Sequence, residues 1–184
     1  MILIKSIHQA SSLLAFYRLK KRRIGFVPTM GALHTGHMAL IQNCKSAELF
    51  CVCSIFINPT QFNNEADFKK YPVSLEADID MLEEAGCDVL FLPSKQEIYP
   101  DGFIPPKYDL GYLETILEGK YRPGHFQGVC QVVDKLLSII KPDQLFLGQK
   151  DYQQCMVIKK LVSLKNYKLE LKIVPTVREN NGLA

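Results

Sequence analysis

The chain has 184 residues and 47% of them are hydrophobic, which is enough for one continuous core and too many for a disordered or fibrous protein. The 22 basic and 19 acidic residues leave a formal net charge of +3, too small to require nucleic acid or an anionic membrane as a partner. The apolar stretches are too short for a signal peptide or for the roughly 20 residues of a membrane span, so we expect a cytoplasmic protein.

Short apolar runs alternate with stretches of helical period, which is typical of a parallel sheet covered by helices on both faces. We therefore expect an α/β fold, a Rossmann-like doubly wound parallel sheet. The expected strands are 24–27, 49–57, 88–92, 145–147 and 169–173. The expected helices are 6–19, 36–47, 74–85, 129–140 and 152–164.

Two long stretches, 58–72 and 93–126, do not fit this alternation, apart from a short amphipathic piece around Leu113, Ile116 and Leu117. Each follows the carboxyl end of an expected strand, where doubly wound sheets bind ligands. Long irregular segments in a compact domain are usually functional loops, so both are expected near a site.

Six cysteines lie mostly inside apolar runs, and none shows the two-residue spacing of a zinc or redox pair. We expect them to be buried, reduced thiols. They are Cys44, Cys51, Cys53, Cys87, Cys130 and Cys155.

Residues 28–37 form the first motif with chemical content, at the junction between a strand and a helix. A helix N-terminus presents unpaired amides and a partial positive charge, so it attracts phosphate. His34 and His37 add donors that can follow negative charge as it builds on a phosphate, and Gly36 lets the backbone come close. The segment predicts an ATP-phosphate site.

A second strand-to-helix junction contains Gly148, Gln149, Lys150 and Asp151. Lys150 is a point charge suited to phosphate oxygens, and Asp151 suits a ribose hydroxyl or a metal-bound water. Asp151 with Gln154 three residues later is equally consistent with a simple helix cap, so both interpretations stay open.

The two irregular stretches each carry one further candidate segment. Asn58 and Gln61 follow a buried strand, and amides there suit a hydroxy acid or a carboxylate, although Asn58 with Pro59 also forms turns. Arg122 in the second stretch either binds phosphate or decorates a loop.

Together these segments resemble the pantoate-beta-alanine ligase family of the cytidylyltransferase-like superfamily. The His-x-Gly-His element alone marks only the superfamily, whereas the complete set is specific to the family and covers the chain in order. The matching strings are Val27 to His34 with Gly36 and His37, Ser54 to Phe62, Tyr71 with Pro72, Glu97 to Pro100, Leu117 to Gly119, Arg122 to Phe126, then Gly148, Lys150, Asp151, Gln153, Gln154, Arg178 and Gly182 to Ala184.

The resemblance implies a reaction in two steps and the residues that serve it. ATP with Mg²⁺ converts pantoate to pantoyl adenylate with loss of pyrophosphate, and beta-alanine then attacks to give pantothenate and AMP. Catalysis is implied for His37, His34 and Lys150. ATP binding is implied for Met30, Gly31, Ala32, Leu33, His34, Thr35, Gly36, His37, Gly148, Gln149, Lys150, Asp151 and the backbone of Val177. Pantoate binding is implied for Gln61, Gln154, Met30, Val132 and Val133, and beta-alanine binding for Gln61. No metal ligand from the protein is expected, and the family implies a homodimer.

Two departures from the family pattern are visible. Gln149 stands where the family usually has glutamate, which we expect to be tolerated because its neighbours are intact. The family's Ser-Ser-Arg-Asn segment and smaller C-terminal domain do not follow Ala184, so we expect 1–176 to be the nucleotide- and pantoate-binding domain and 177–184 the start of a hinge. A chain of this extent is expected to turn over slowly. The alternatives are a binding module without catalysis and another His-x-Gly-His nucleotidyltransferase, which would need basic residues in place of Gln61 and Gln154.

Overall fold

A computed structural model describes residues 1–62, 66 and 70–184. Its centre is a six-stranded sheet in which every neighbouring pair is parallel, in the order β1-β4-β3-β2-β5-β6. The strands are β1 (Ile2–Ile4), β2 (Ile24–Thr29), β3 (Phe50–Ile55), β4 (Val89–Phe91), β5 (Gln144–Gly148) and β6 (Glu170–Val174). The expected doubly wound parallel sheet is confirmed.

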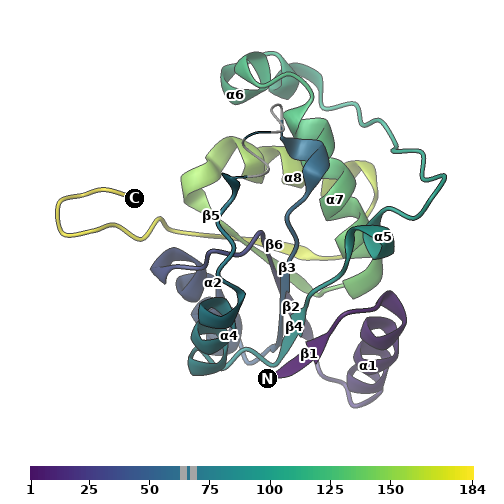
Figure 1. Cartoon of the computed structure of the whole chain (residues 1–184), viewed down its shortest axis with the longest axis vertical. Helices are drawn as coiled ribbons and strands as arrows, with labels where there is room; N and C mark the ends of the chain where they lie inside the picture. The colour runs from purple at the N-terminus through teal and green to yellow at the C-terminus, as the bar shows by residue number, and fades with distance from the viewer. Residues whose placement is uncertain (63–65, 67–69) are drawn as a thin grey trace.

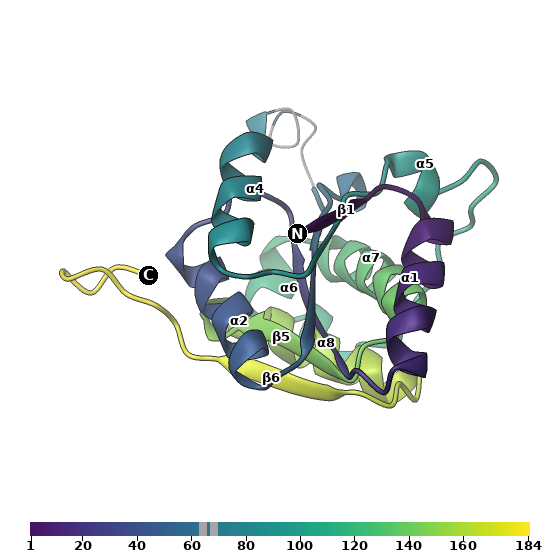
Figure 2. The ribbon, with the colours of Figure 1, turned by 90° about the horizontal axis from the view of Figure 1, so that it is seen from below.

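Helices cover both faces of the sheet, α2 and α4 on one and α1, α7 and α8 on the other (Figures 1 and 2). The helices are α1 (Ile7–Leu19), α2 (Thr35–Ser46), α4 (Leu75–Glu84), α5 (Lys95–Ile98), α6 (Leu117–Tyr121), α7 (His125–Ile140) and α8 (Tyr152–Leu164). Short 3₁₀ turns lie at Pro59–Gln61, Gly111–Glu114 and Gln149–Asp151. No helix of the described ranges is long and apolar enough to cross a membrane.

Two separate apolar clusters hold these layers together. The cluster beneath α2 and α4 includes Ile41 and Leu82, and the larger cluster beneath α1, α7 and α8 includes Leu14, Leu137 and Ile158. Strands β2 and β3 lie between the two clusters and are almost completely buried, which explains why they read as unbroken apolar runs. All six cysteines are free and buried, as the sequence predicts.

The sheet reverses its winding between β2 and β5. From β2 the chain proceeds outward through β3 and β4 on one side, whereas β5 and β6 lie on the other. A crevice forms at such a switch point, outside the carboxyl ends of the strands, because the two following helices diverge to opposite faces. The two junctions that the sequence analysis predicts to bind phosphate follow these two strands.

Three local expectations need correction. Strand β1 was not expected, because it has only three residues and two of them are exposed, so no alternation is visible. Helix α7 begins at His125, four residues before the first apolar position of its periodic stripe. The piece around Leu113 is a 3₁₀ turn followed by the five-residue α6, and Leu117 is 67% exposed instead of packing as part of an apolar face.

Candidate active site

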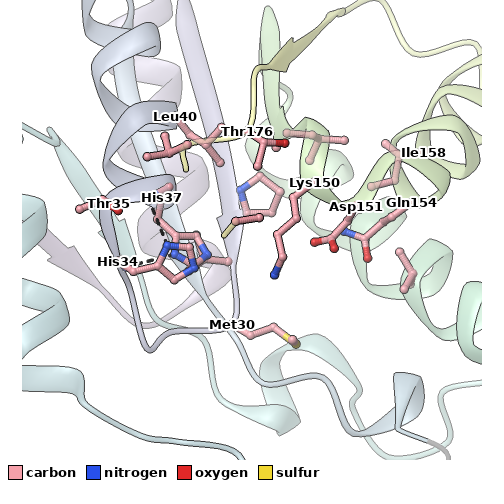
Figure 3. A pocket seen from close by; sticks show the side chains of 18 of the residues that line it. Met30, His34, Thr35, His37, Leu40, Lys150, Asp151, Gln154, Ile158 and Thr176 are labelled. Atoms are coloured by element: carbon pink, nitrogen blue, oxygen red, sulfur yellow. Dashed lines mark hydrogen bonds between the residues drawn. The ribbon is translucent and has the colours of Figure 1, made fainter. Parts of the chain in front are cut away.

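A cavity of about 460 Å³ occupies the switch point between β2 and β5 (Figure 3). Its walls come from the turn after β2, the start of α2, the middle of α7, the start of α8 and the segment after β6. The lining residues are Pro28, Thr29, Met30, His34, Thr35, Gly36, His37, Leu40, Phe56, Gln61, Tyr71, Val129, Val132, Val133, Leu136, Leu147, Gly148, Lys150, Asp151, Gln154, Ile158, Pro175, Thr176, Val177, Arg178, Glu179 and Ala184.

The turn between β2 and α2 has an unusual backbone. Gly31 and Ala32 both have positive φ, +85° and +51°, a region that alanine rarely adopts. Thr29 stabilises the entry to this turn, since its hydroxyl donates to the Ser54 carbonyl at 2.8 Å and accepts from the Gly31 amide at 3.3 Å. The next two amides, of Ala32 and Leu33, donate to a side chain of α4 and not to the cavity.

The two histidines cap helix α2 reciprocally. His34 is the N-cap, and its Nδ1 accepts from the Gly36 amide at 3.1 Å, while Nδ1 of His37 accepts from the His34 amide at 3.3 Å. The rings lie 4.1 Å apart between centroids. An Nδ1 that accepts carries no proton, so each neutral imidazole holds its proton on Nε2. Gly36 is needed here because a Cβ would lie 2.9 Å from Cε1 of His34.

His37 is held in its neutral form. The pKa of His37 is lowered to about 4, mainly by burial and then by the neighbouring His34 and by Lys150, while Asp78 acts in the opposite direction. At neutral pH the ring is therefore an uncharged donor through Nε2–H. The positive charge on this wall comes from Lys150, which extends into the cavity toward the two rings (Figure 3).

The junction after β5 is more open than the junction after β2. Gly148 has no atom within 4 Å of a hypothetical Cβ, and Gln149–Asp151 form a single 3₁₀ turn before α8. Asp151 is the N-cap residue of α8, but its side chain makes no capping hydrogen bond. Its carboxylate lies at the cavity wall beside Lys150 and Gln154 (Figure 3), so the side chain does not act as the helix cap that the sequence allowed.

A network of hydrogen bonds surrounds Gln61, which lines the same cavity. The Gln61 amide donates to the sulfur of Met30 at 2.8 Å, and Nδ2 of the fully buried Asn58 donates to Oε1 of Gln61 at 3.3 Å. Asn58 also accepts from Tyr99 at 2.9 Å and donates to the Gly128 carbonyl at 3.0 Å, so it anchors the turn that carries Gln61.

Helix α7 supports the same turn at two points. Nδ1 of His125 donates to the Gln61 carbonyl at 2.8 Å, and burial lowers the pKa of His125. Gly128 allows α7 to touch the turn directly, because a Cβ there would lie 2.3 Å from the Thr60 carbonyl oxygen. The position of Gln61 is therefore set by backbone contacts and not only by its own side chain.

Most of the residues expected at the site line this one cavity. They are Met30, His34, Thr35, Gly36, His37, Gln61, Val132, Val133, Gly148, Lys150, Asp151, Gln154 and Val177. Gly31, Ala32 and Leu33 do not line it, since their amides donate to Thr29 and to α4. Gln149 borders a neighbouring hollow instead. Arg122 forms an ion pair with Glu118 at 3.0 Å on the exposed side of α6, as expected if it is a surface residue of the loop.

Three residues that build the site were not singled out by the sequence analysis. Asp78 accepts hydrogen bonds from the turn after β2, and Tyr99 and His125 support the Asn58–Gln61 turn. Tyr99 and His125 stand inside two of the matching family strings, where no role was assigned to them, whereas Asp78 left a signal of its own. It stands with Leu75, Ile79 and Leu82 at helical spacing, and a carboxylate on an apolar face requires partners.

Comparison with known proteins identifies the family. The sequence profile described as "Pantoate-beta-alanine ligase" matches residues 2–184. The chain belongs to this family. The pantothenate synthetase of Cytophaga hutchinsonii is 51% identical over 184 residues, a match that takes in all of this chain and 65% of that protein. The chain thus spans slightly less than two thirds of the length of this relative.

Solved structures of the pantoate-beta-alanine ligase family share the fold. Pantothenate synthetase from Thermus thermophilus superposes with a TM-score of 0.92 at 40% identity, over all of this chain and 66% of that one. Pantoate-beta-alanine ligase from Francisella tularensis, described as complexed with beta-gamma ATP and beta-alanine, gives 0.91 at 49% identity over all of this chain and 70% of that one.

Proposed function

We propose that this chain carries the ATP- and pantoate-binding site of an ATP-dependent pantoate-beta-alanine ligase. The observation that carries the proposal is one cavity that brings three kinds of side chain together. Hydrogen-bond donors from the two strand-to-helix junctions, the amides of Gln61 and Gln154, and apolar side chains all line it. The family relationship and the Francisella tularensis complex with an ATP ligand and beta-alanine support the same assignment.

The hydrogen-bond donors of the cavity suit the triphosphate of ATP. His34 and His37 present Nε2–H groups beside the start of α2, and Lys150 supplies a full positive charge. When the pantoate carboxylate attacks the α phosphorus, negative charge grows on the phosphate oxygens and on the departing pyrophosphate. These donors stabilise that charge, and His37 is the more buried of the two histidines.

The amide and apolar lining residues suit a small branched hydroxy acid. Gln61 and Gln154 offer amide groups to a carboxylate and hydroxyls, and Met30, Val132 and Val133 offer apolar surface to the two methyl groups of pantoate. Because amides are neutral, these residues do not favour a phosphate as acceptor, which argues against an adenylyltransferase acting on a phosphorylated substrate.

The complete reaction then follows in two balanced steps. A carboxylate oxygen of pantoate bonds to the α phosphorus while the bond to pyrophosphate breaks, giving pantoyl adenylate. The amine of beta-alanine, bound next to Gln61, then attacks the acyl carbon, loses a proton, and displaces AMP. The resulting amide is pantothenate.

Mg²⁺ and quaternary structure belong to the same proposal. Mg²⁺ usually keeps several waters when it binds substrate phosphates, and Asp151 is a carboxylate at the cavity wall that would suit one of these metal-bound waters. The ion would neutralise phosphate charge. We further propose a cytoplasmic homodimer, and a boundary at 176, after which the chain runs away from the sheet as an extended arm (Figures 1 and 2).

Ligand binding to the protein tests the proposal most directly. We expect ATP to bind weakly and pantoate to bind in its presence, detected by saturation-transfer NMR, with slow pantoate-dependent exchange of pyrophosphate into ATP. Gln154→Leu should abolish pantoate binding and leave ATP binding intact, because the variant removes one of the two amides that the proposal assigns to pantoate. If the wild-type protein binds ATP but pantoate does not bind in its presence, the chain is a nucleotide-binding module instead.

A further inference from the structure

A buried carboxylate next to the candidate site has no part in the chemistry proposed above. Asp78 of α4 is only 2% exposed, and both of its oxygens are occupied. Oδ2 accepts from the Ala32 amide at 2.9 Å, and Oδ1 accepts from the Leu33 amide at 2.8 Å and from the Ser74 hydroxyl at 3.0 Å. A buried charge without such partners would be strongly unfavourable, so the contacts explain why it is tolerated.

The partners of Asp78 belong to the turn that leads into the histidine pair. Two consecutive amides can point to one carboxylate only if the backbone turns sharply, and Gly31 and Ala32 have the positive φ angles that produce this turn. The turn is also tightly packed, because a Cβ on Gly31 would lie 3.1 Å from Oδ2 of Asp78. In a positive-φ conformation that alanine disfavours, these hydrogen bonds offset the local backbone strain.

The conformation of this turn fixes the start of α2. His34 follows Leu33 directly, and its own amide donates to Nδ1 of His37 while its ring caps Gly36. A change of the Leu33 backbone would redirect the His34 amide and break the reciprocal cap. The link from Asp78 to both imidazoles therefore runs through three consecutive backbone amides.

We propose that Asp78 is a positioning residue, which holds the turn at 31–33 so that His34 and His37 present Nε2–H to the phosphates of ATP. The inference deepens the proposed function and rests on it for the identity of the ligand. Asp78 touches neither ATP nor pantoate in this role. It also keeps the Ala32 and Leu33 amides away from the phosphates, so the imidazoles and Lys150 are left to bind them.

Asp78→Asn is the decisive variant, and Asp80→Asn is its matched control. Asparagine has one acceptor oxygen, so only one of the two turn amides keeps a partner. Asp80 lies two residues further along α4 and is exposed. In Asp78→Asn we expect hydrogen exchange of the Ala32 and Leu33 amides to accelerate about tenfold or more, and ATP to bind about tenfold more weakly. Asp80→Asn should change neither by more than about twofold.

ATP affinity is the readout that a purely structural role would not move. Asp78 also raises the pKa of His37, so in Asp78→Asn this pKa should fall below its wild-type value through the loss of the charge alone, measured from the imidazole NMR shifts of the unliganded protein. If Asp78→Asn lowers the melting temperature while ATP affinity stays as in the wild type, the proposal is wrong whatever the His37 titration shows.

A second substitution covers the case in which Asp78→Asn does not fold. Replacing the Leu33 amide N–H by an ester oxygen removes one donor and leaves the carboxylate and all side chains in place. ATP affinity should again fall about tenfold. Unchanged affinity would overturn the proposal. None of these measurements involves pantoate, so a failure of the proposed ligase function, seen as absent pantoate binding, is recognised separately.

Discussion

The two strand-to-helix junctions that meet at the cavity are built in opposite ways. After β2, nearly every polar group of the turn already has a partner, through Thr29, Asp78 and the reciprocal histidine cap. After β5, the side chains of Lys150 and Asp151 form no hydrogen bond or ion pair with any described part of the chain.

The difference shows how one site combines a fixed and an adaptable part. Donors whose positions are set before the ligand arrives need no reorganisation when charge develops, which favours the β2 junction for transition-state stabilisation. A long, unpaired lysine can follow phosphates that change position between substrate and product. We therefore expect substitutions at the β2 junction to disturb both folding and binding, and those at the β5 junction to disturb binding alone.

The largest effect is expected for His37→Ala at the fixed junction. The variant loses the Nε2–H donor and the cap on the His34 amide together, so ATP affinity should fall about 10- to 100-fold and the unfolding free energy by about 1 kcal/mol. Titration calorimetry and urea unfolding measure the two quantities. His8→Ala, an exposed histidine of α1, is the control and should change neither. If His37→Ala binds ATP as tightly as the wild type does, the histidine pair does not belong to the ATP site.

Lys150→Met tests the adaptable junction. The methionine keeps the length of the side chain and removes its charge, so ATP affinity should fall about tenfold while the unfolding free energy changes by less than about 0.5 kcal/mol. Lys159→Met, an exposed lysine of the following helix α8, is the matched control. A clear loss of stability in Lys150→Met would mean that this junction is as tightly built as the other.

The pH dependence connects the two junctions. The pKa of His37 is lowered to about 4, so folding favours the neutral ring, and its contribution to stability is complete above the unfolded value near 6.5 and is lost as the pH falls toward 4. Burial, His34 and Lys150 all lower the pKa of His37, and Asp78 raises it. The NMR titration midpoint of His37 should therefore rise in Lys150→Met. An unchanged midpoint would show that the charge of Lys150 has no effect on His37, so that the two junctions are electrostatically independent.

The smallest effect is expected for Gln149→Glu, which introduces the residue usual in the family. Gln149 is exposed and borders the hollow beside the main cavity, not the cavity itself. ATP affinity should stay within about twofold of the wild type, as judged by titration calorimetry. A larger change would extend the adaptable junction by one residue.

The sequence predicted the sheet well because its strands are buried on both faces. β2, β3 and β5 appear as unbroken apolar runs between helices of clear period, and these signals depend only on local composition. β1 was missed because three residues with one buried side chain give no pattern, although pairing with β4 stabilises the strand. Tertiary contacts, not propensity, define it.

The site was predicted only as far as its side chains face the cavity. His34, His37 and Lys150 stand in motifs that chemistry makes recognisable. Asp78 and His125 act through hydrogen bonds to backbone groups 45 and 64 residues away, and no spacing rule connects such pairs. The sequence could not show that the amides of Ala32 and Leu33, which were expected at ATP, donate instead to Asp78.

Gly128 allows the close contact between α7 and the turn that carries Gln61. A methyl group at this position would collide with the Thr60 carbonyl oxygen, so the Asn58–Gln61 turn and α7 would be wedged apart. Gln61 in turn donates to the sulfur of Met30, which leads into the histidine turn, so this displacement would reach both parts of the cavity. Gly128 does not line the cavity, yet its lack of a side chain is a condition for the position of Gln61.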